Sequence, residues 1–118
     1  MTVARYRRFL GAADKEYGKY EKTKNEDFLA EAGEKLWNAF QMLMETLSGK
    51  KIRSYGDLKK VLVDYTNDDV VIETQQKVYR LHVFFYRGWT EDITEISDAF
   101  LMASANMVII EKKYGVRK

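Results

Sequence analysis

Apolar residues recur every three or four positions through most of the chain, which is the spacing of one face of an α-helix. The first such stripe consists of Val3, Tyr6, Leu10, Ala13, Tyr17 and Tyr20. Thr2 can cap the start of this helix, and the polar run at residues 21–25 is expected to end it. The pattern therefore predicts a long first helix.

A second helix is predicted over residues 26–48. Asn25 precedes Glu26 and Asp27, so a capping side chain and two acids stand where the exposed amides and the positive dipole end of a helix lie. Gly49 follows, and glycine readily adopts the left-handed conformation that ends many helices. The apolar stripe of this segment is Phe28, Ala32, Leu36, Ala39, Phe40, Leu43 and Leu47.

Two further helix starts follow. Ser54 and Asp57 have the spacing of a capping box, with Asp in place of the usual Glu. They open a short helix whose apolar face is Leu58, Val61, Leu62 and Tyr65. Cap residues at 66–69 open a fourth helix with the stripe Val71, Val78, Leu81, His82, Phe85 and Trp89. This helix start explains Asp64, Asp68 and Asp69 more simply than a cation site does.

The last helix is predicted to follow the fourth as an antiparallel hairpin. Gly88 can end the fourth helix, and Thr90, Glu91 and Asp92 can start the fifth. One apolar stripe of this helix is Ile93, Ile96, Phe100, Ala103, Met107, Ile110 and Tyr114, and a second is Leu101, Ala105, Val108 and Ile109. Two interpretations stay open: a central helix wrapped by the other four, or a helix whose second side meets another subunit.

These elements predict an all-α fold, an antiparallel helical bundle of about five helices in a single domain over residues 1–118. A chain of 118 residues with 46% hydrophobic content can bury one core. The absence of cysteine excludes disulfides, thiolate catalysis and Cys-based metal sites. Because the chain lacks an apolar leader and any run of about 18 consecutive apolar residues, we expect a cytoplasmic protein without a membrane span.

The net charge is only +2, but the basic residues are clustered. Lys and Arg outnumber Asp and Glu by seven to three in residues 1–24, five to one in 49–60 and four to one in 110–118. If these segments converge in the fold, they form a phosphate-facing patch; otherwise they are solvated surface. The candidates for nucleic-acid binding are Arg5, Arg7, Arg8, Lys50, Lys51 and Arg53.

Two stretches resemble segments of a known superfamily. Residues 32–39 (Ala-Gly-Glu-Lys-Leu-Trp-Asn-Ala) are similar to an A-x-E-K-x-W-x-A segment, and residues 81–86 (Leu-His-Val-Phe-Phe-Tyr) to a later L-H-x-N-F-Y element. Together they resemble the archaeal branch of the HEPN helical superfamily, including the PaREP-type proteins. The motif residues are Glu34, Lys35, Trp37, Leu81, His82, Phe85 and Tyr86. Phe84 replaces the expected amide, and Tyr55 stands where relatives often have histidine.

The resemblance implies a helical bundle that commonly forms a homodimer. The superfamily includes ribonucleases, nucleotide-binding companions of nucleotidyltransferases and members with no established activity. In its ribonucleases, four to six residues separate an arginine from the histidine that follows it. This chain has Gln75, Gln76 and Lys77 at the corresponding positions. A lysine cannot reproduce the bidentate phosphate grip of arginine, so the resemblance favours no catalytic residue here.

His82, the only histidine, has two interpretations. It is either a general base assisted by Lys77, or a buried or half-buried imidazole held by a hydrogen bond to another helix, and the second is favoured. A metal site is not expected, since no His-x-x-His or Glu-x-x-His spacing exists. Trp37 and Tyr86 can stack a base, although such residues more often anchor a core or an interface.

The sequence therefore favours a non-catalytic binding or interaction module. As a homodimer, it would present a helical surface to nucleic acid, a nucleotide or a protein companion, without a cofactor. The alternative is a divergent metal-independent endoribonuclease in which His82 assists attack of a ribose hydroxyl on the adjacent phosphate. A third interpretation is a structural dimer that occupies a partner, as an antitoxin does.

Overall fold

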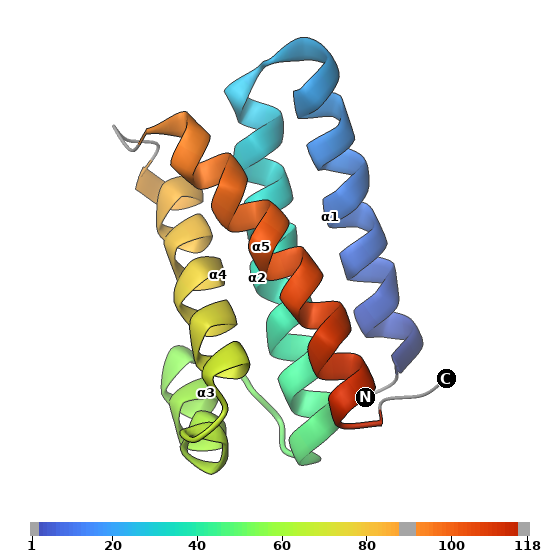
Figure 1. The fold of residues 1–118 in the computed structure, drawn as a ribbon, viewed down its shortest axis with the longest axis vertical. Helices are drawn as coiled ribbons and strands as arrows, with labels where there is room; N and C mark the ends of the chain where they lie inside the picture. Colours follow the sequence, from blue (N-terminus) through green and yellow to red (C-terminus); the bar gives the residue numbers. More distant parts are fainter. Residues whose placement is uncertain (1–2, 88–91, 116–118) are drawn as a thin grey trace.

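The computed structural model describes residues 3–87 and 92–115, and all regular structure in those ranges is helical. The described elements are α1 (Val3–Thr23), α2 (Glu26–Ser48), α3 (Tyr55–Leu62), the 3-10 turn η1 (Val63–Tyr65), α4 (Asp69–Arg87) and α5 (Ile93–Lys113). They form a bundle of 38 × 26 × 23 Å (Figure 1). The predicted all-α fold is confirmed.

Several predicted caps define the helix ends. Asn25 accepts a hydrogen bond from the Asp27 amide at 2.9 Å, and Gly49 has the left-handed φ of 72° that ends α2. Ser54 accepts from the Asp57 amide at 3.1 Å to start α3. Asp92 starts α5 in the same way. The predicted roles of Thr2, Gly88, Thr90 and Glu91, together with Trp89, lie outside the described residues.

The central helix of the bundle is α2. It packs against α1, α3, α4 and α5, and Leu36, Phe40 and Leu43 on it are fully buried. Helix α5 crosses in front of α2 between α4 and α1 (Figure 1). Tyr17 of α1 stacks on Phe100 of α5 with ring centroids 4.5 Å apart. The interpretation in which the last helix is the central one is therefore wrong.

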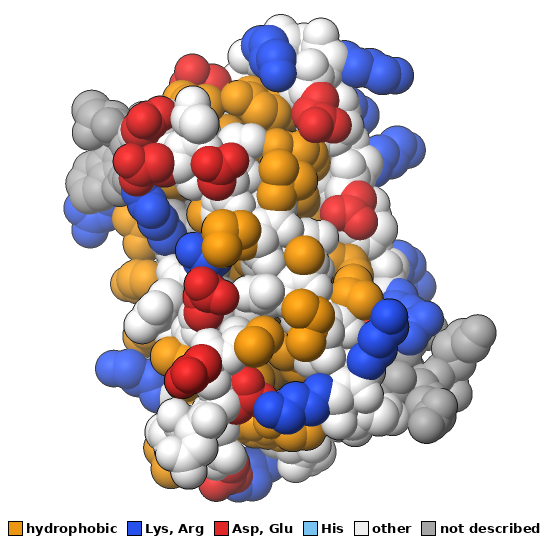
Figure 2. Space-filling view, viewed as in Figure 1, with side chains coloured by type: hydrophobic (Ala, Val, Ile, Leu, Met, Phe, Trp, Pro, Cys, Tyr) orange, Lys and Arg blue, Asp and Glu red, His pale blue; other side chains and the backbone are white. Residues whose placement is uncertain are grey.

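The second apolar stripe of α5 faces solvent, because the other helices cover only one side of α5. The inner stripe residues Ile96, Phe100, Ala103, Met107 and Ile110 are buried, whereas Leu101, Ala105, Val108 and Ile109 are exposed. Apolar side chains are visible along α5 in the space-filling view (Figure 2). By length and composition α5 could cross a membrane, and 33% of its most apolar stretch is buried inside the bundle.

The inward face of α4 differs from the predicted stripe near its end. Phe84 is buried, whereas Phe85 is only half-buried. The reason is that Phe84 follows the buried Leu81 by three residues and so lies on the same face of the helix. The element that departs from the family pattern at Phe84 thus places that ring in the core. His82 lies at the edge of the same face and is also half-buried.

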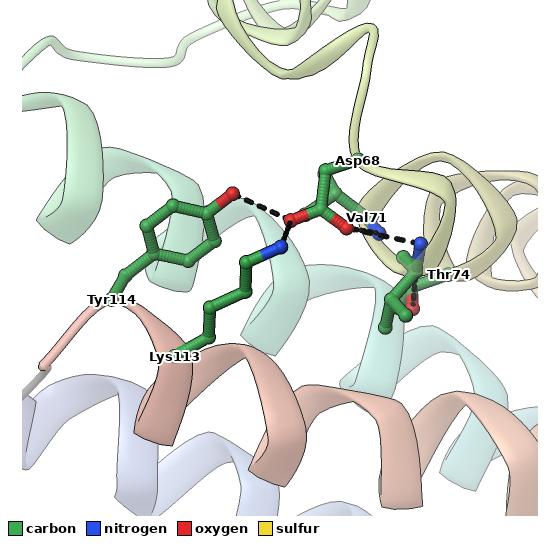
Figure 3. Close-up of polar contacts among 6 residues, drawn as sticks. Asp68, Val71, Thr74, Lys113 and Tyr114 are labelled. Atoms are coloured by element: carbon green, nitrogen blue, oxygen red, sulfur yellow. Dashed lines mark hydrogen bonds and ion pairs between the residues drawn. The ribbon is translucent and has the colours of Figure 1, made fainter.

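Asp68 joins the start of α4 to the end of α5 (Figure 3). Its Oδ1 atom accepts hydrogen bonds from the amides of Val70 at 3.0 Å and Val71 at 3.3 Å, so it is the predicted helix cap. Its Oδ2 atom accepts from Lys113 Nζ at 2.9 Å and from the Tyr114 hydroxyl at 2.5 Å. Four donors on one carboxylate explain why it can be buried as an anion.

We expect the Asp68→Asn variant to lose about 1 to 2 kcal/mol of stability at neutral pH. Asparagine can still cap α4, but its amide group cannot accept from both Lys113 and Tyr114. Hydrogen bonding from the Tyr114 hydroxyl, with that from Lys113, lowers the pKa of Asp68 to about 2, while the same contact raises the pKa of Tyr114 to about 12. Urea unfolding measures the difference.

The pH dependence of this variant follows from the lowered pKa. Because Asp68 is easier to ionise in the folded chain, its contribution is complete above pH 4 and is lost as the pH falls from about 4 to about 2. The wild type and Asp68→Asn should therefore converge in stability near pH 2. A difference that stays constant between pH 7 and pH 2 would contradict this assignment.

Candidate functional site

A contact between α2 and α4 joins the two motifs that carry the family resemblance. His82 Nδ1 lies 2.7 Å from Glu34 Oε1, and both side chains are half-buried. The helices approach closely here, because a Cβ atom at Gly33 would lie only 3.1 Å from the Cβ of Leu81. The predicted hydrogen bond from His82 to another helix is therefore present, and sequence reasoning did not identify Glu34 as its partner.

The charge of Glu34 sets the direction of this hydrogen bond. When Glu34 is ionised, its carboxylate can only accept, so Nδ1 of His82 is the donor and Nε2 takes no part in the contact. Burial raises the pKa of Glu34, and the hydrogen bond from His82 opposes that rise. The pair also resembles part of a hydrolytic site, in which His82 would be the general base and Glu34 the group that orients it.

A row of aromatic rings surrounds the pair. We define the aromatic row as Tyr86, His82, Trp37, Tyr79 and Tyr55. Trp37 stacks on His82 with centroids 4.7 Å apart, and Tyr86 meets His82 edge-on at 4.9 Å. Tyr79 meets Trp37 edge-on at 5.8 Å and stacks on Tyr55 at 5.1 Å.

The rings of the row differ in exposure. Trp37 is 5% exposed, so it anchors the row from inside and packing is its main role. Tyr55 and Tyr79 are exposed by 37% and 40%, and Tyr86 by 68%. Lys59 lies 5.2 Å from the centre of the Tyr55 ring. The row therefore offers three partly exposed tyrosine rings, with a cation at the Tyr55 end.

Some of the predicted basic residues converge on one cavity. We define the basic cavity as the cavity of about 270 Å³ lined by Arg5, Asn38, Gln41, Met42, Glu45, Lys51, Ile52 and Arg53. A neighbouring cavity shares Glu45 and Lys51 and includes Lys50. Arg7 instead forms an ion pair with Glu111 at 3.2 Å, and Arg8 is exposed without lining either cavity.

The loop between α2 and α3 presents these cations. Ile52 is buried, so Lys51 and Arg53 on either side of it remain at the surface. The Ile52 amide donates to Glu45 Oε2 at 2.7 Å, which fixes the loop against α2. The charged ends of Lys51 and Arg53 make no hydrogen bond or ion pair within the described part of the chain. Sequence reasoning missed Glu45 because its contact is with a backbone amide in an irregular loop.

The aromatic row and the basic cavity lie on one face of α2, and together they are called the α2 face. Glu34, Asn38, Gln41 and Glu45 are spaced by four, three and four residues, which keeps them on the same side of the helix. Glu34 contacts His82 in the row, and the other three line the cavity. Eleven residue-to-residue steps along the helix separate Glu34 from Glu45, a distance of about 16 Å. Tyr55 of the row also follows Arg53 of the cavity by two residues.

The remaining motif residues support the packing of this region. Leu81 is fully buried against Gly33, and Phe85 meets Tyr86 edge-on at 5.0 Å. Lys35 forms an ion pair with Glu31 at 3.3 Å. Lys77, which the ribonuclease hypothesis paired with His82, makes no hydrogen bond or ion pair with it in residues 3–87.

The comparisons with known proteins add no family assignment. No protein-family model, curated protein or solved structure matches this chain. The HEPN-like resemblance consequently stays a prediction from the two motifs. Among the residues that the structure describes, no group of three or more His, Cys, Asp or Glu side chains is placed to hold a metal ion.

Proposed function

We propose that this chain is a non-catalytic, HEPN-like binding module that forms a homodimer and holds single-stranded nucleic acid on the α2 face. The observation that carries the proposal is the joining of an aromatic row and a basic cavity on one side of α2. Aromatic rings stack bases, while a neighbouring basic groove holds phosphates. Protein and nucleotide companions are the competing ligands.

The chemistry of the row favours unpaired bases. A base can stack on a tyrosine face only after leaving its own stack, which costs least in a single strand. Tyr86 is the most exposed of the three tyrosines at 68%, whereas Tyr55 and Tyr79 stack on each other and offer a smaller part of their surface. Lys51 and Arg53 would meet the phosphates, supported by Arg5 at the rim of the same cavity.

One observation favours the alternative of a metal-independent ribonuclease. The hydrogen bond between Glu34 and His82 orients the imidazole as a general base would require. Such a reaction also needs a cation beside the phosphate to stabilise the developing charge. Within the described residues Lys77 makes no hydrogen bond with His82, and Arg5, Lys51 and Arg53 line a cavity whose lining does not include His82. We therefore propose binding without cleavage.

We expect the Lys51→Glu/Arg53→Glu double variant to bind a short fluorescein-labelled single-stranded RNA at least about tenfold more weakly than the wild type. The reason is that two phosphate-facing cations become anions in the basic cavity. Fluorescence anisotropy across a salt series measures the affinity, and wild-type affinity should fall as salt rises. The recovered RNA should be intact after incubation in chelator.

The matched control is Lys15→Glu/Lys22→Glu, which changes the net charge equally at exposed positions of α1 that line neither cavity. It should bind RNA nearly as well as the wild type. If both double variants weakened RNA binding equally, the effect would come from the overall charge of the protein, and the proposed site would be refuted. RNA cleavage by the wild type that disappears in His82→Ala would instead support the ribonuclease.

A further inference from the structure

The exposed side of α5 carries an apolar stripe that the described residues leave open to solvent. We define the α5 stripe as Leu101, Met102, Ala105, Val108 and Ile109. The four large members are exposed by 42% to 50%, although they lie on a helix whose other side is fully buried. Apolar side chains grouped on one helix face are typical of a contact surface.

One charged residue stands at each end of the stripe, and neither forms an ion pair in the described part of the chain. Asp98 precedes it and Lys112 follows it, both exposed. Neighbouring charges on α5 are paired within the chain: Glu95 with Arg80 at 2.7 Å, and Lys113 with Asp68 at 2.9 Å. Asp98 and Lys112 form no ion pair within residues 3–87 and 92–115.

The stripe is symmetric about Ala105. Leu101 and Ile109 lie four residues to either side, Met102 and Val108 lie three residues to either side, and Asp98 and Lys112 lie seven residues to either side. In an antiparallel pair of α5 helices centred on Ala105, each residue of one copy would therefore lie against the residue of the other copy that is equally far from Ala105 in the opposite direction. Alanine at the centre lets two helix backbones approach closely.

We propose that a second copy of this chain covers the α5 stripe, with the two α5 helices antiparallel across a two-fold axis at Ala105. Leu101 of one copy packs on Ile109 of the other, and Met102 packs on Val108. Asp98 of each copy pairs with Lys112 of the other, so each of these residues gains an opposite charge across the interface. This inference deepens the proposed function, which includes a homodimer, by naming its interface.

Charge distinguishes this occupant from two others. A parallel pair of α5 helices would place Asp98 beside Asp98 and Lys112 beside Lys112, so like charges would repel. Helices that lie on anionic membranes carry Lys and Arg along their polar face. The first half of α5 instead carries Glu95 and Asp98, and acidic side chains gather near its start (Figure 2).

A charge-swap series tests the arrangement by sedimentation velocity over a wide range of protein concentration. The wild type is expected to dimerise, and Asp98→Lys or Lys112→Asp alone should weaken the dimer about tenfold, since each places two like-charge pairs at the interface. The double variant Asp98→Lys/Lys112→Asp should recover most of the wild-type affinity. Leu101→Asp should be monomeric, with circular dichroism showing that its helices are intact.

Several results would overturn the interface. They are a wild type that stays monomeric at the highest concentration, single swaps without effect, a double swap no better than the singles, and a monomeric wild type that binds anionic lipid vesicles. RNA binding per chain is measured on the same samples. Because the α2 face and the α5 stripe share no residues, RNA binding per chain should be unchanged in Leu101→Asp. Failure of the dimer and failure of RNA binding are therefore distinguishable.

Discussion

The Trp37→Ala variant is expected to lose about 3 to 5 kcal/mol of its free energy of unfolding. Trp37 is almost fully buried, stacks on His82 of α4 and meets Tyr79 of the same helix and Tyr55 of α3. Removing its ring leaves a cavity where three helices meet. Equilibrium urea unfolding followed by circular dichroism measures the loss.

The control for this prediction is Tyr86→Ala, at the exposed end of the same aromatic row. Tyr86 is 68% exposed, so its removal should cost less than about 1 kcal/mol of stability. If a base stacks on Tyr86, RNA binding should nevertheless weaken by about fivefold or more. A Trp37→Ala variant no less stable than Tyr86→Ala would show that Trp37 is not the anchor of the row.

The Gly33→Leu variant is expected to lose about 3 kcal/mol of stability, at the upper end of what overpacking a core usually costs. The new side chain would start 3.1 Å from the Cβ of Leu81, and both helix backbones hold these atoms in place. Relief requires α2 and α4 to separate, which also lengthens the contact between Glu34 and His82. Urea unfolding measures the stability, and the NMR signals of the His82 ring report the contact.

The matched control for Gly33→Leu is Gly18→Leu in α1. A Cβ atom at Gly18 meets nothing within 4 Å, and leucine is a better helix former than glycine by several tenths of a kcal/mol. Gly18→Leu should therefore be at least as stable as the wild type. Wild-type stability in Gly33→Leu would contradict the close approach of the two helices that positions the site.

The helices could be predicted because their signals are local. Caps such as Asn25 and Ser54 act on amides two or three residues away, and apolar spacing identifies the inward face of each helix. The role of α5 could not be predicted, since its two stripes look alike in the sequence. Only the packing of α1, α2 and α4 decides which stripe is buried.

The candidate site could be predicted only in parts. The sequence identified both Glu34 and His82 as motif residues, but their contact joins positions 48 residues apart. It also proposed six basic residues, and the fold brings Arg5 to Lys51 and Arg53 while directing Arg7 toward Glu111. Such convergence depends on how α1 packs on α2, and charge clustering along the chain carries no information about it.

The most direct test of the proposed function is an NMR titration of the isotope-labelled protein with a short single-stranded RNA. We predict that the largest shifts cluster at the amides of Lys51, Arg53 and Tyr55, at the ring of Tyr86 and at the indole NH of Trp37, and that they weaken as salt is added. The amides of Leu101 and Ile109 should not respond. Shifts centred on the α5 stripe, or none at saturating RNA, would contradict the assignment of the α2 face to nucleic-acid binding.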